Sequence, residues 1–250
     1  MMKKLLHAIL LAGTAAGWAA NNPVLRQEND YFCRAVSSFE EKGSLEEWRR
    51  CGALPLFLAE ERNRMIPDWE GPLDVEVTVY LLHDARFLYF GALVRDRHPS
   101  RQASPEALYR GDGFQLAFDP LDDTILPGYD ANDIELGFGL LQNGTPAAYC
   151  WRGGEALKTG LLPEIRLKVT PVGSDSLLYE AAIPWSCLAP FLPSQRNKFG
   201  FNVLYNSARD GKRRGWLHWT PGVGEEKLAF LFRNVRLVSA QEGTAEAAIN

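Results

Sequence analysis

Three side chains close together in the sequence have the chemistry to contact a ligand rich in hydroxyl groups. Tyr109 has an aromatic face that can stack on the C–H surface of a pyranose ring, and Arg110 and Asp112 can form charge-assisted hydrogen bonds with hydroxyl groups. Gly111 and Gly113 flank Asp112, so the backbone can bend tightly there and let other groups approach. The alternative is that Arg110 and Asp112 cap a turn and pair with neighbouring side chains.

The residues that follow must position these side chains, and their pattern is that of a β-strand. Apolar residues alternate with polar or small ones over 113–119, which is the period of two expected of a strand. One face carries Phe114, Leu116 and Phe118, and the other carries Gln115, Ala117 and Asp119. A half-buried strand of this kind can serve as a binding platform, with Gln115 as a further contact.

Other strands predict further contacts on the same platform. The polar face of 133–141 carries Glu135, Gly137 and Gly139, and two positions without side chains would leave a shallow trough. Three tryptophans could add aromatic surfaces, namely Trp151, Trp216 and Trp219. Packing in the core and at its rim is the favoured interpretation for these three residues.

A loop rich in carboxylates surrounds Gly128. Its acids are Asp119, Asp122, Asp123, Asp130 and Asp133. Calcium takes six to eight oxygen ligands, so structural calcium held by Asp119, Asp122, Asp130 and Asp133 is a hypothesis. The spacing matches no EF-hand, and the alternative is a set of solvated loop acids.

The chain has four cysteines, Cys33, Cys51, Cys150 and Cys187. An even number in an exported chain favours disulfides, with three pairings formally open. We favour Cys33 with Cys51 and Cys150 with Cys187, and the alternative is buried free thiols. No CxxC motif or Cys/His cluster indicates zinc.

Catalysis is not indicated. The chain contains no GxSxG or HExxH motif, and His83, His98 and His218 have no triad context. A glycosidase needs two carboxylates at a set separation across a cleft, and nothing in the spacing of Glu135 and Glu180 demands it.

The ends and the charge of the chain indicate where it acts. Lys3 and Lys4, an apolar run and Gly17-Trp18-Ala19 have the pattern of a signal peptide over 1–19, cleaved near Ala19, which predicts export to the periplasm or the extracellular space. The apolar run is too short for a membrane span. The net charge is −4 with scattered bases, which argues against nucleic acid and anionic membranes as partners.

The remaining chain divides into a polar lead-in (20–43), one β-domain (44–238) and a flexible tail (239–250). Short strands separated by turn residues are expected from residue 75 onward, after an edge strand near Pro55. A short helical turn is expected at Ser44–Trp48 and another after Pro184. Many short strands without a long helical period predict an all-β antiparallel β-sandwich or barrel.

Several segments together resemble family 9 carbohydrate-binding modules, a jelly-roll β-sandwich of the wider DOMON-like group. The matching segments, in order along the chain, are Leu45-Glu46-Glu47-Trp48, Phe87-Leu88-Tyr89-Phe90, Val94-Arg95-Asp96, Tyr109-Arg110-Gly111-Asp112, Tyr179-Glu180-Ala181-Ala182-Ile183-Pro184-Trp185, Phe199-Gly200-Phe201-Asn202 with Asn206, and His218-Trp219. They extend across most of the chain.

The resemblance implies that a sugar is held between two aromatic rings and polar side chains. Tyr109 stands at one ring position, Asp112 at an acidic position, Gln115 where an acid is usual, and Asn206 at a polar position. The chain departs from the family twice, since Gly137 stands where a binding arginine is expected, and the second ring position (221–227) contains no aromatic residue.

The sequence therefore predicts an exported, non-catalytic module that binds carbohydrate through Tyr109, Arg110, Asp112, Gln115 and Asn206, with Trp151 and Trp219 as further contacts, and that supports polysaccharide recognition or breakdown. No cofactor is required, and calcium is the one ion considered. Haem, which some DOMON relatives bind, is not expected, because Met65 is the only methionine after the signal. The alternative is a scaffold for protein–protein contacts at the cell envelope with a degenerate sugar site.

Overall fold

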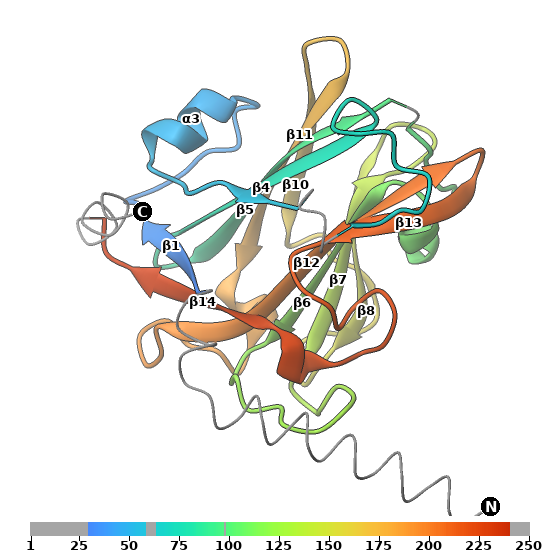
Figure 1. The fold of residues 1–250 in the computed structure, drawn as a ribbon. Helices are drawn as coiled ribbons and strands as arrows, with labels where there is room; N and C mark the ends of the chain where they lie inside the picture. Colours follow the sequence, from blue (N-terminus) through green and yellow to red (C-terminus); the bar gives the residue numbers. More distant parts are fainter. Residues whose placement is uncertain (1–29, 59–63, 98, 241–250) are drawn as a thin grey trace, which may run out of the picture.

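A computed structural model describes residues 30–58, 64–97 and 99–240 (Figure 1). The expected signal peptide lies outside the described residues, as does nearly all of the expected tail. In the part that is described, no helix is long and apolar enough to cross a membrane.

Within these residues, most of the regular secondary structure is β-strand. The strands are β1 (Tyr31–Ala35), β2 (Leu56–Phe57), β3 (Arg64–Met65), β4 (Val75–His83), β5 (Phe87–Asp96), β6 (Gly113–Asp119), β7 (Ile134–Leu140), β8 (Pro146–Gly153), β9 (Gly160–Leu161), β10 (Arg166–Val172), β11 (Ser176–Pro184), β12 (Lys198–Arg209), β13 (Lys212–His218) and β14 (Arg233–Val238). The helical segments are α3 (Leu45–Arg50) and the 3-10 turns η2 (Pro105–Arg110), η3 (Trp185–Leu188) and η4 (Ala229–Leu231).

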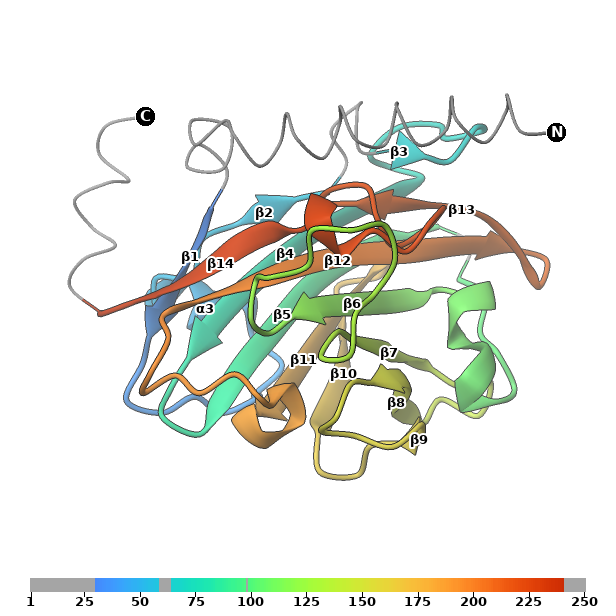
Figure 2. The ribbon, with the colours of Figure 1, turned by 90° about the horizontal axis from the view of Figure 1, so that it is seen from below.

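The strands form one sheet that curls into two facing layers (Figure 2). Its order is β10-β11-β5-β4-β1-β14-β12-β6-β7-β8-β9, with β13 added beside β12 and β2 beside β4. We call β10, β11, β5 and β4 the first layer, and β12, β13, β6, β7 and β8 the second layer. The two layers are built of antiparallel pairs, whereas β1, which joins them, is parallel to both β4 and β14. The predicted all-β sandwich is confirmed.

The core lies between the layers and is rich in aromatic rings. Phe90 of the first layer contacts Phe114 and Phe138 of the second, with ring centroids 5.2 and 5.8 Å apart. Phe114 also meets Tyr179 at 5.2 Å. All three phenylalanines are fully buried, as the alternation of apolar residues along their strands predicts.

The outer face of the first layer is covered by α3. Trp48 of this helix is fully buried, and its indole lies where a side chain on Gly91 would collide with it. Its Nε1 donates a hydrogen bond to Glu180 Oε1 (3.0 Å), while the Gly43 amide donates to Glu180 Oε2 (2.6 Å). Burial raises the pKa of Glu180. This carboxylate therefore anchors the N-terminal segment and has no room for catalysis.

Two sequence predictions fail at the level of the fold. The segment expected to be a polar lead-in contains β1, whose Tyr31 and Cys33 are buried between β14 and β4. The strand β6 is buried on both faces rather than one. Its outer residues are covered by other parts of the chain, which hydropathy alternation does not reveal.

The four cysteines are free, so neither favoured disulfide is formed. Cys33 faces the central core, whereas Cys51 ends α3 and packs with the separate cluster outside the first layer. Cys150 and Cys187 are both buried in the central core, and burial raises the pKa of each thiol, to about 11 and about 12 respectively. The alternative of buried thiols is therefore the one observed.

Candidate functional site

The outer face of the second layer brings together residues from β6, β7, β8, β12 and β13. Strand register places Trp216 beside Asn206, Asn206 beside Gly113, and Gln115 beside Gly137. Trp151 and Tyr109 lie at the far side of this row, over β7. We call these residues the aromatic face: Tyr109, Gln115, Trp151, Asn206, Arg213 and Trp216.

Two amide side chains form its floor. Gln115 Nε2 donates a hydrogen bond to Asn206 Oδ1 (3.2 Å), and Asn206 Nδ2 donates to the Gly113 carbonyl (3.3 Å). Gln115 is 4% exposed and Asn206 is fully buried. Buried amides keep a fixed orientation when they are hydrogen-bonded, so this pair supports the face from beneath by joining β12 to β6.

A pair of aromatic rings forms one side of the face. The Trp151 indole rests on Gly137, where a Cβ would lie 2.3 Å from its Cη2, and its Nε1 donates to the Glu106 carbonyl (2.9 Å). Tyr109 meets Trp151 edge to face, with centroids 6.0 Å apart. Gly137 is therefore required for close approach. The predicted empty trough is filled, because Leu108 covers Gly139 as Trp151 covers Gly137.

Trp216 and Arg213 form the other side. A bulge between Ser207 and Ala208 shifts the register of β12 against β13, so Arg213 pairs with Ala208 and Trp216 with Asn206. Residues three apart in a regular strand point to opposite faces, but the bulge puts these two on the same face. The guanidinium of Arg213 stacks on the Trp216 ring, 4.3 Å from its centroid.

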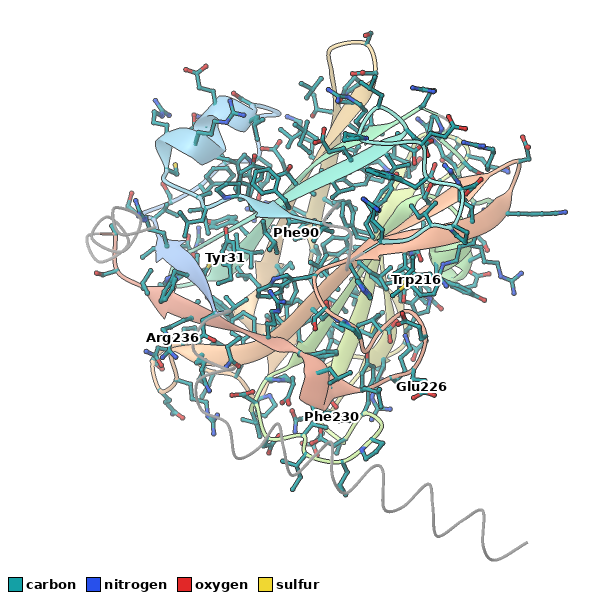
Figure 3. All side chains as sticks on the ribbon, viewed as in Figure 1. Tyr31, Phe90, Trp216, Glu226, Phe230 and Arg236 are labelled. Carbon is teal, nitrogen blue, oxygen red and sulfur yellow. The ribbon has the colours of Figure 1, made fainter. Side chains whose placement is uncertain are left out.

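This side of the face has polar atoms without partners. Among the described residues, the buried atoms Arg213 Nε, Arg213 Nη2 and Trp216 Nε1 have no hydrogen-bond partner, and neither ring nitrogen of His218 has one. Burial lowers the pKa of His218. Unpaired buried polar groups are costly and uncommon, so a water molecule or a polar ligand atom that bonds to them would be stabilising here. Figure 3 shows Trp216 on the same side of the sandwich as Glu226, in the connection from β13 to β14.

The structure separates the sequence-predicted ligand residues. Tyr109, Gln115, Asn206 and Trp151 come together on the aromatic face. Arg110 is exposed beside it, and its Nε donates to the Tyr109 hydroxyl (3.0 Å). Arg213 was not predicted, because strict alternation from Trp216 places it on the wrong face.

Two residues that the sequence predicts as ligand contacts, Asp112 and Trp219, have structural roles instead. Asp112 is 6% exposed, with one carboxylate oxygen accepting the Ala208 amide (2.7 Å) and the other the Ser100 amide, so it ties the loop before β6 to β12. Trp219 is 3% exposed in the core and packs edge to face with Tyr31. Neither can contact a ligand on the outer face, because their polar atoms or rings are already enclosed.

The acidic loop is held by its own hydrogen bonds. Asp119 accepts the amides of Asp123 (3.3 Å) and Thr124 (3.1 Å), and Asp133 accepts the Asp130 amide (2.7 Å) and the Thr124 hydroxyl (3.2 Å). Asp122 is turned to a salt bridge with Lys198 at 2.5 Å. In the described ranges, no group of three or more His, Cys, Asp or Glu residues is arranged to hold a metal ion. Calcium at this loop stays a prediction.

Asp133→Asn is expected to flatten the dependence of stability on pH. Burial raises the pKa of Asp133 to about 7, whereas an unfolded aspartate titrates near ~3.9. Between these values the folded chain holds a proton that the unfolded chain has lost, so stability falls as pH rises through this window. The melting temperature of the unmodified chain should fall by several degrees across it, and that of the variant should fall less.

Thermal melts at intervals across this window test the prediction, and equal slopes for the two proteins would contradict it. The same melts with added calcium, at a pH above the pKa of Asp133, test calcium binding at this loop. A bound cation would offset the buried negative charge and raise the melting temperature.

A separate cavity of about 300 Å³ lies at one end of the sandwich. Asp96, Asp112, Tyr179 and Tyr205 are among its lining residues, and the Tyr205 hydroxyl donates to Asp96 (3.3 Å). Burial raises the pKa of both tyrosines. None of the aromatic-face residues lines this cavity. The cavity is therefore a second candidate ligand site, separate from the aromatic face.

Comparison with known proteins decides the family. A model of the carbohydrate family 9 binding domain-like proteins matches residues 60–239. The chain belongs to this family. Family 9 modules bind carbohydrate without catalysing a reaction, so the chain is a binding module and not an enzyme. A search of curated proteins gave no match.

Solved structures show the same fold. A carbohydrate binding module family 9 from Caldicellulosiruptor kristjanssonii in complex with cellotriose is 16% identical with a TM-score of 0.59, over 86% of this chain and 96% of that one. A family 9 module from the same organism in complex with glucose is 16% identical with a TM-score of 0.61, over 83% and 95%. A Bacteroides uniformis protein is 11% identical with a TM-score of 0.53, over 83% and 97%.

Proposed function

We propose that the aromatic face binds an oligo- or polysaccharide. The observation that carries this proposal is the row of Trp216 (β13), Asn206 (β12), Gln115 (β6) and Trp151 (β8, lying over β7), with unpaired donors on Arg213 and Trp216. Indole rings suit the apolar faces of pyranose rings, and amides with a guanidinium suit hydroxyl groups. The ligands of the two Caldicellulosiruptor modules, cellotriose and glucose, support this class of ligand.

The two departures from the family pattern have local compensations. The segment 221–227 has no aromatic residue, but Gly224 lies against the Trp216 ring, with a hypothetical Cβ 2.4 Å from its Cε2. Gly224 and Arg213 both pack on the half-buried indole of Trp216, so the candidate for the second ring is the part of this indole that they leave uncovered. Arg213 can supply the guanidinium that is missing at Gly137, because strand register places both residues on the same face of the second layer.

We also infer that the chain acts outside the cytoplasm, in the recognition or breakdown of polysaccharide by other proteins. The basic and apolar start of the sequence supports export. The competing function, a scaffold for protein contacts at the envelope, requires no sugar affinity, so glycan binding distinguishes the two.

Tryptophan-fluorescence titration of the chain from Ala20 onward with a panel of oligo- and polysaccharides tests the proposal. Saturable quenching by at least one glycan is the expected result, and it should persist in Tyr179→Phe, which alters only the distant cavity. Loss of quenching in Tyr179→Phe would move the site to that cavity. A flat response of folded protein across the whole panel would contradict carbohydrate binding.

A further inference from the structure

Arg213 is the charged group of the aromatic face that lacks an ion-pair partner among the described residues. Glu135, the buried acid nearby, is already bound to Lys227 at 2.7 Å. Arg110, the neighbouring base, donates its Nε to the Tyr109 hydroxyl. Glu225 acts on Arg213 electrostatically but is exposed, and no salt bridge joins the two. A positive charge thus remains uncompensated on this face.

The unpaired atoms of Arg213 have a specific geometry. Nε and Nη2 carry the two parallel N–H bonds along one edge of the guanidinium, and both atoms are buried without an acceptor. Trp216 covers one face of the guanidinium, so a ligand would approach along an edge, and Nε with Nη2 form the edge that has no acceptor. Two parallel N–H bonds match the two oxygens of a carboxylate, which is the strongest planar partner of arginine.

Burial makes such a partner more valuable. Burial lowers the pKa of Arg213, which means that its charge is held in surroundings that solvate it poorly. A charged donor of this kind gains most from an acceptor that also carries charge. Sugar hydroxyl groups can accept from Nε or Nη2 singly, but they leave the charge uncompensated.

Resting on the proposed function, we propose that the carbohydrate bound at this face is acidic, and that Arg213 binds the carboxylate of a uronic acid through Nε and Nη2. The pyranose ring of this uronic acid would lie beside Trp216, above the buried amides of Gln115 and Asn206. Arg213 is then the residue that selects acidic over neutral sugars.

Matched ligands test this at constant ionic strength. D-glucuronate, its uncharged amide glucuronamide and D-glucose share a pyranose ring, and D-galacturonate with D-galactose provides a second stereochemical pair. In fluorescence titrations of the full exported chain, at least one uronate is expected to bind tenfold or more tightly than its neutral counterparts. Its affinity should also fall with added salt, because the interaction is between charges.

Variants separate the guanidinium from the fold. Arg213→Lys keeps the charge but not the parallel N–H bonds, so it should weaken the binding of the uronate at least tenfold more than it weakens the binding of the matched neutral sugar. Arg49→Lys, an exposed position on α3, is the matched control and should change neither. Thermal melts show whether each variant is folded. If a variant does not fold, the comparison of uronates with neutral sugars on the unmodified chain still tests the inference.

The outcomes are distinct. Neutral sugars that bind as tightly as both uronates would overturn the acidic-sugar inference while carbohydrate binding stands. An equal loss for all ligands in Arg213→Lys would also overturn it, because the residue would then contact shared hydroxyl groups. Folded protein that binds none of these ligands and no glycan of the panel would remove the proposed function itself.

Discussion

Replacing Arg214 with methionine is expected to lower the free energy of unfolding by about 3–5 kcal/mol, the cost typical of leaving one member of a buried ion pair alone. Arg214 donates two hydrogen bonds to the Asp74 carboxylate, from Nη1 to Oδ1 (3.0 Å) and from Nη2 to Oδ2 (2.9 Å). The Asp74 side chain is fully buried and that of Arg214 is 8% exposed. The pair joins β13 of the second layer to the start of β4 in the first.

Two further variants separate this explanation from general damage. Although burial alone would raise it, the Arg214 hydrogen bonds hold the pKa of Asp74 below its ordinary value. The double variant Arg214→Met with Asp74→Asn should therefore recover part of the loss, since the buried negative charge is removed together with its main partner. Arg209→Met, which removes a longer contact of 3.4 Å to the same carboxylate, should cost less than about 1 kcal/mol in chemical denaturation. Equal losses for Arg214→Met and Arg209→Met would contradict the account.

Trp216→Ala is expected to weaken glycan binding at least ~30-fold, about 2 kcal/mol, because central aromatic anchors dominate binding energy. The substitution removes the ring that borders the amide pair and the surface on which Arg213 is stacked. The affinity would be measured by calorimetry with the glycan that gives the strongest response. A loss of less than about threefold would place the binding elsewhere.

Trp69→Ala is the matched control. Trp69 is also partly buried and stacked by an arginine, Arg64, at 4.0 Å from its ring, but it lies near the start of β4. The Trp69→Ala substitution should lower thermal stability without changing the affinity for glycan. An effect of Trp69→Ala on affinity as large as that of Trp216→Ala would indicate a general loss of structure in both variants.

Much of the fold follows from local sequence pattern. The alternation in 113–119 gives β6 its bounds, and the strand expected over 133–141 lies within one residue of β7 at each end. The helical turn near Trp48 and the one after Pro184 follow in the same way. Each of these elements depends on residues close together in the chain, which is why the sequence alone predicts them.

The errors arise where distant segments meet. Tyr31 and Cys33 belong to a strand because β14 and β4 lie on either side of it, and a five-residue segment carries little periodic signal. Asp112 has the chemistry of a ligand contact, but the amides of Ser100 and Ala208 occupy its oxygens. Neither partner can be identified from the residues around it.

The most informative error concerns the candidate site. The sequence offered Trp216 as a possible aromatic surface and gave no indication of Arg213, whereas the bulge beside Ser207 places both side chains on the same face. The local signal for it is Gly215, whose φ of +154° suits a glycine at an irregular position in the strand. A glycine between charged residues and a tryptophan thus indicates that side chains on its two sides need not alternate regularly between the faces of the strand.

Indole resonances give the most direct test of the binding face. In a ¹⁵N-labelled chain titrated with the glycan that quenches fluorescence, the Nε1–H signals of Trp216 and Trp151 should shift with saturation. Those of Trp48 and Trp185, which are buried and bonded to Glu180 and Asp84, should stay in place. Saturable binding that shifts Trp48 or Trp185 and leaves Trp216 and Trp151 unchanged would contradict the assignment of the site to the aromatic face.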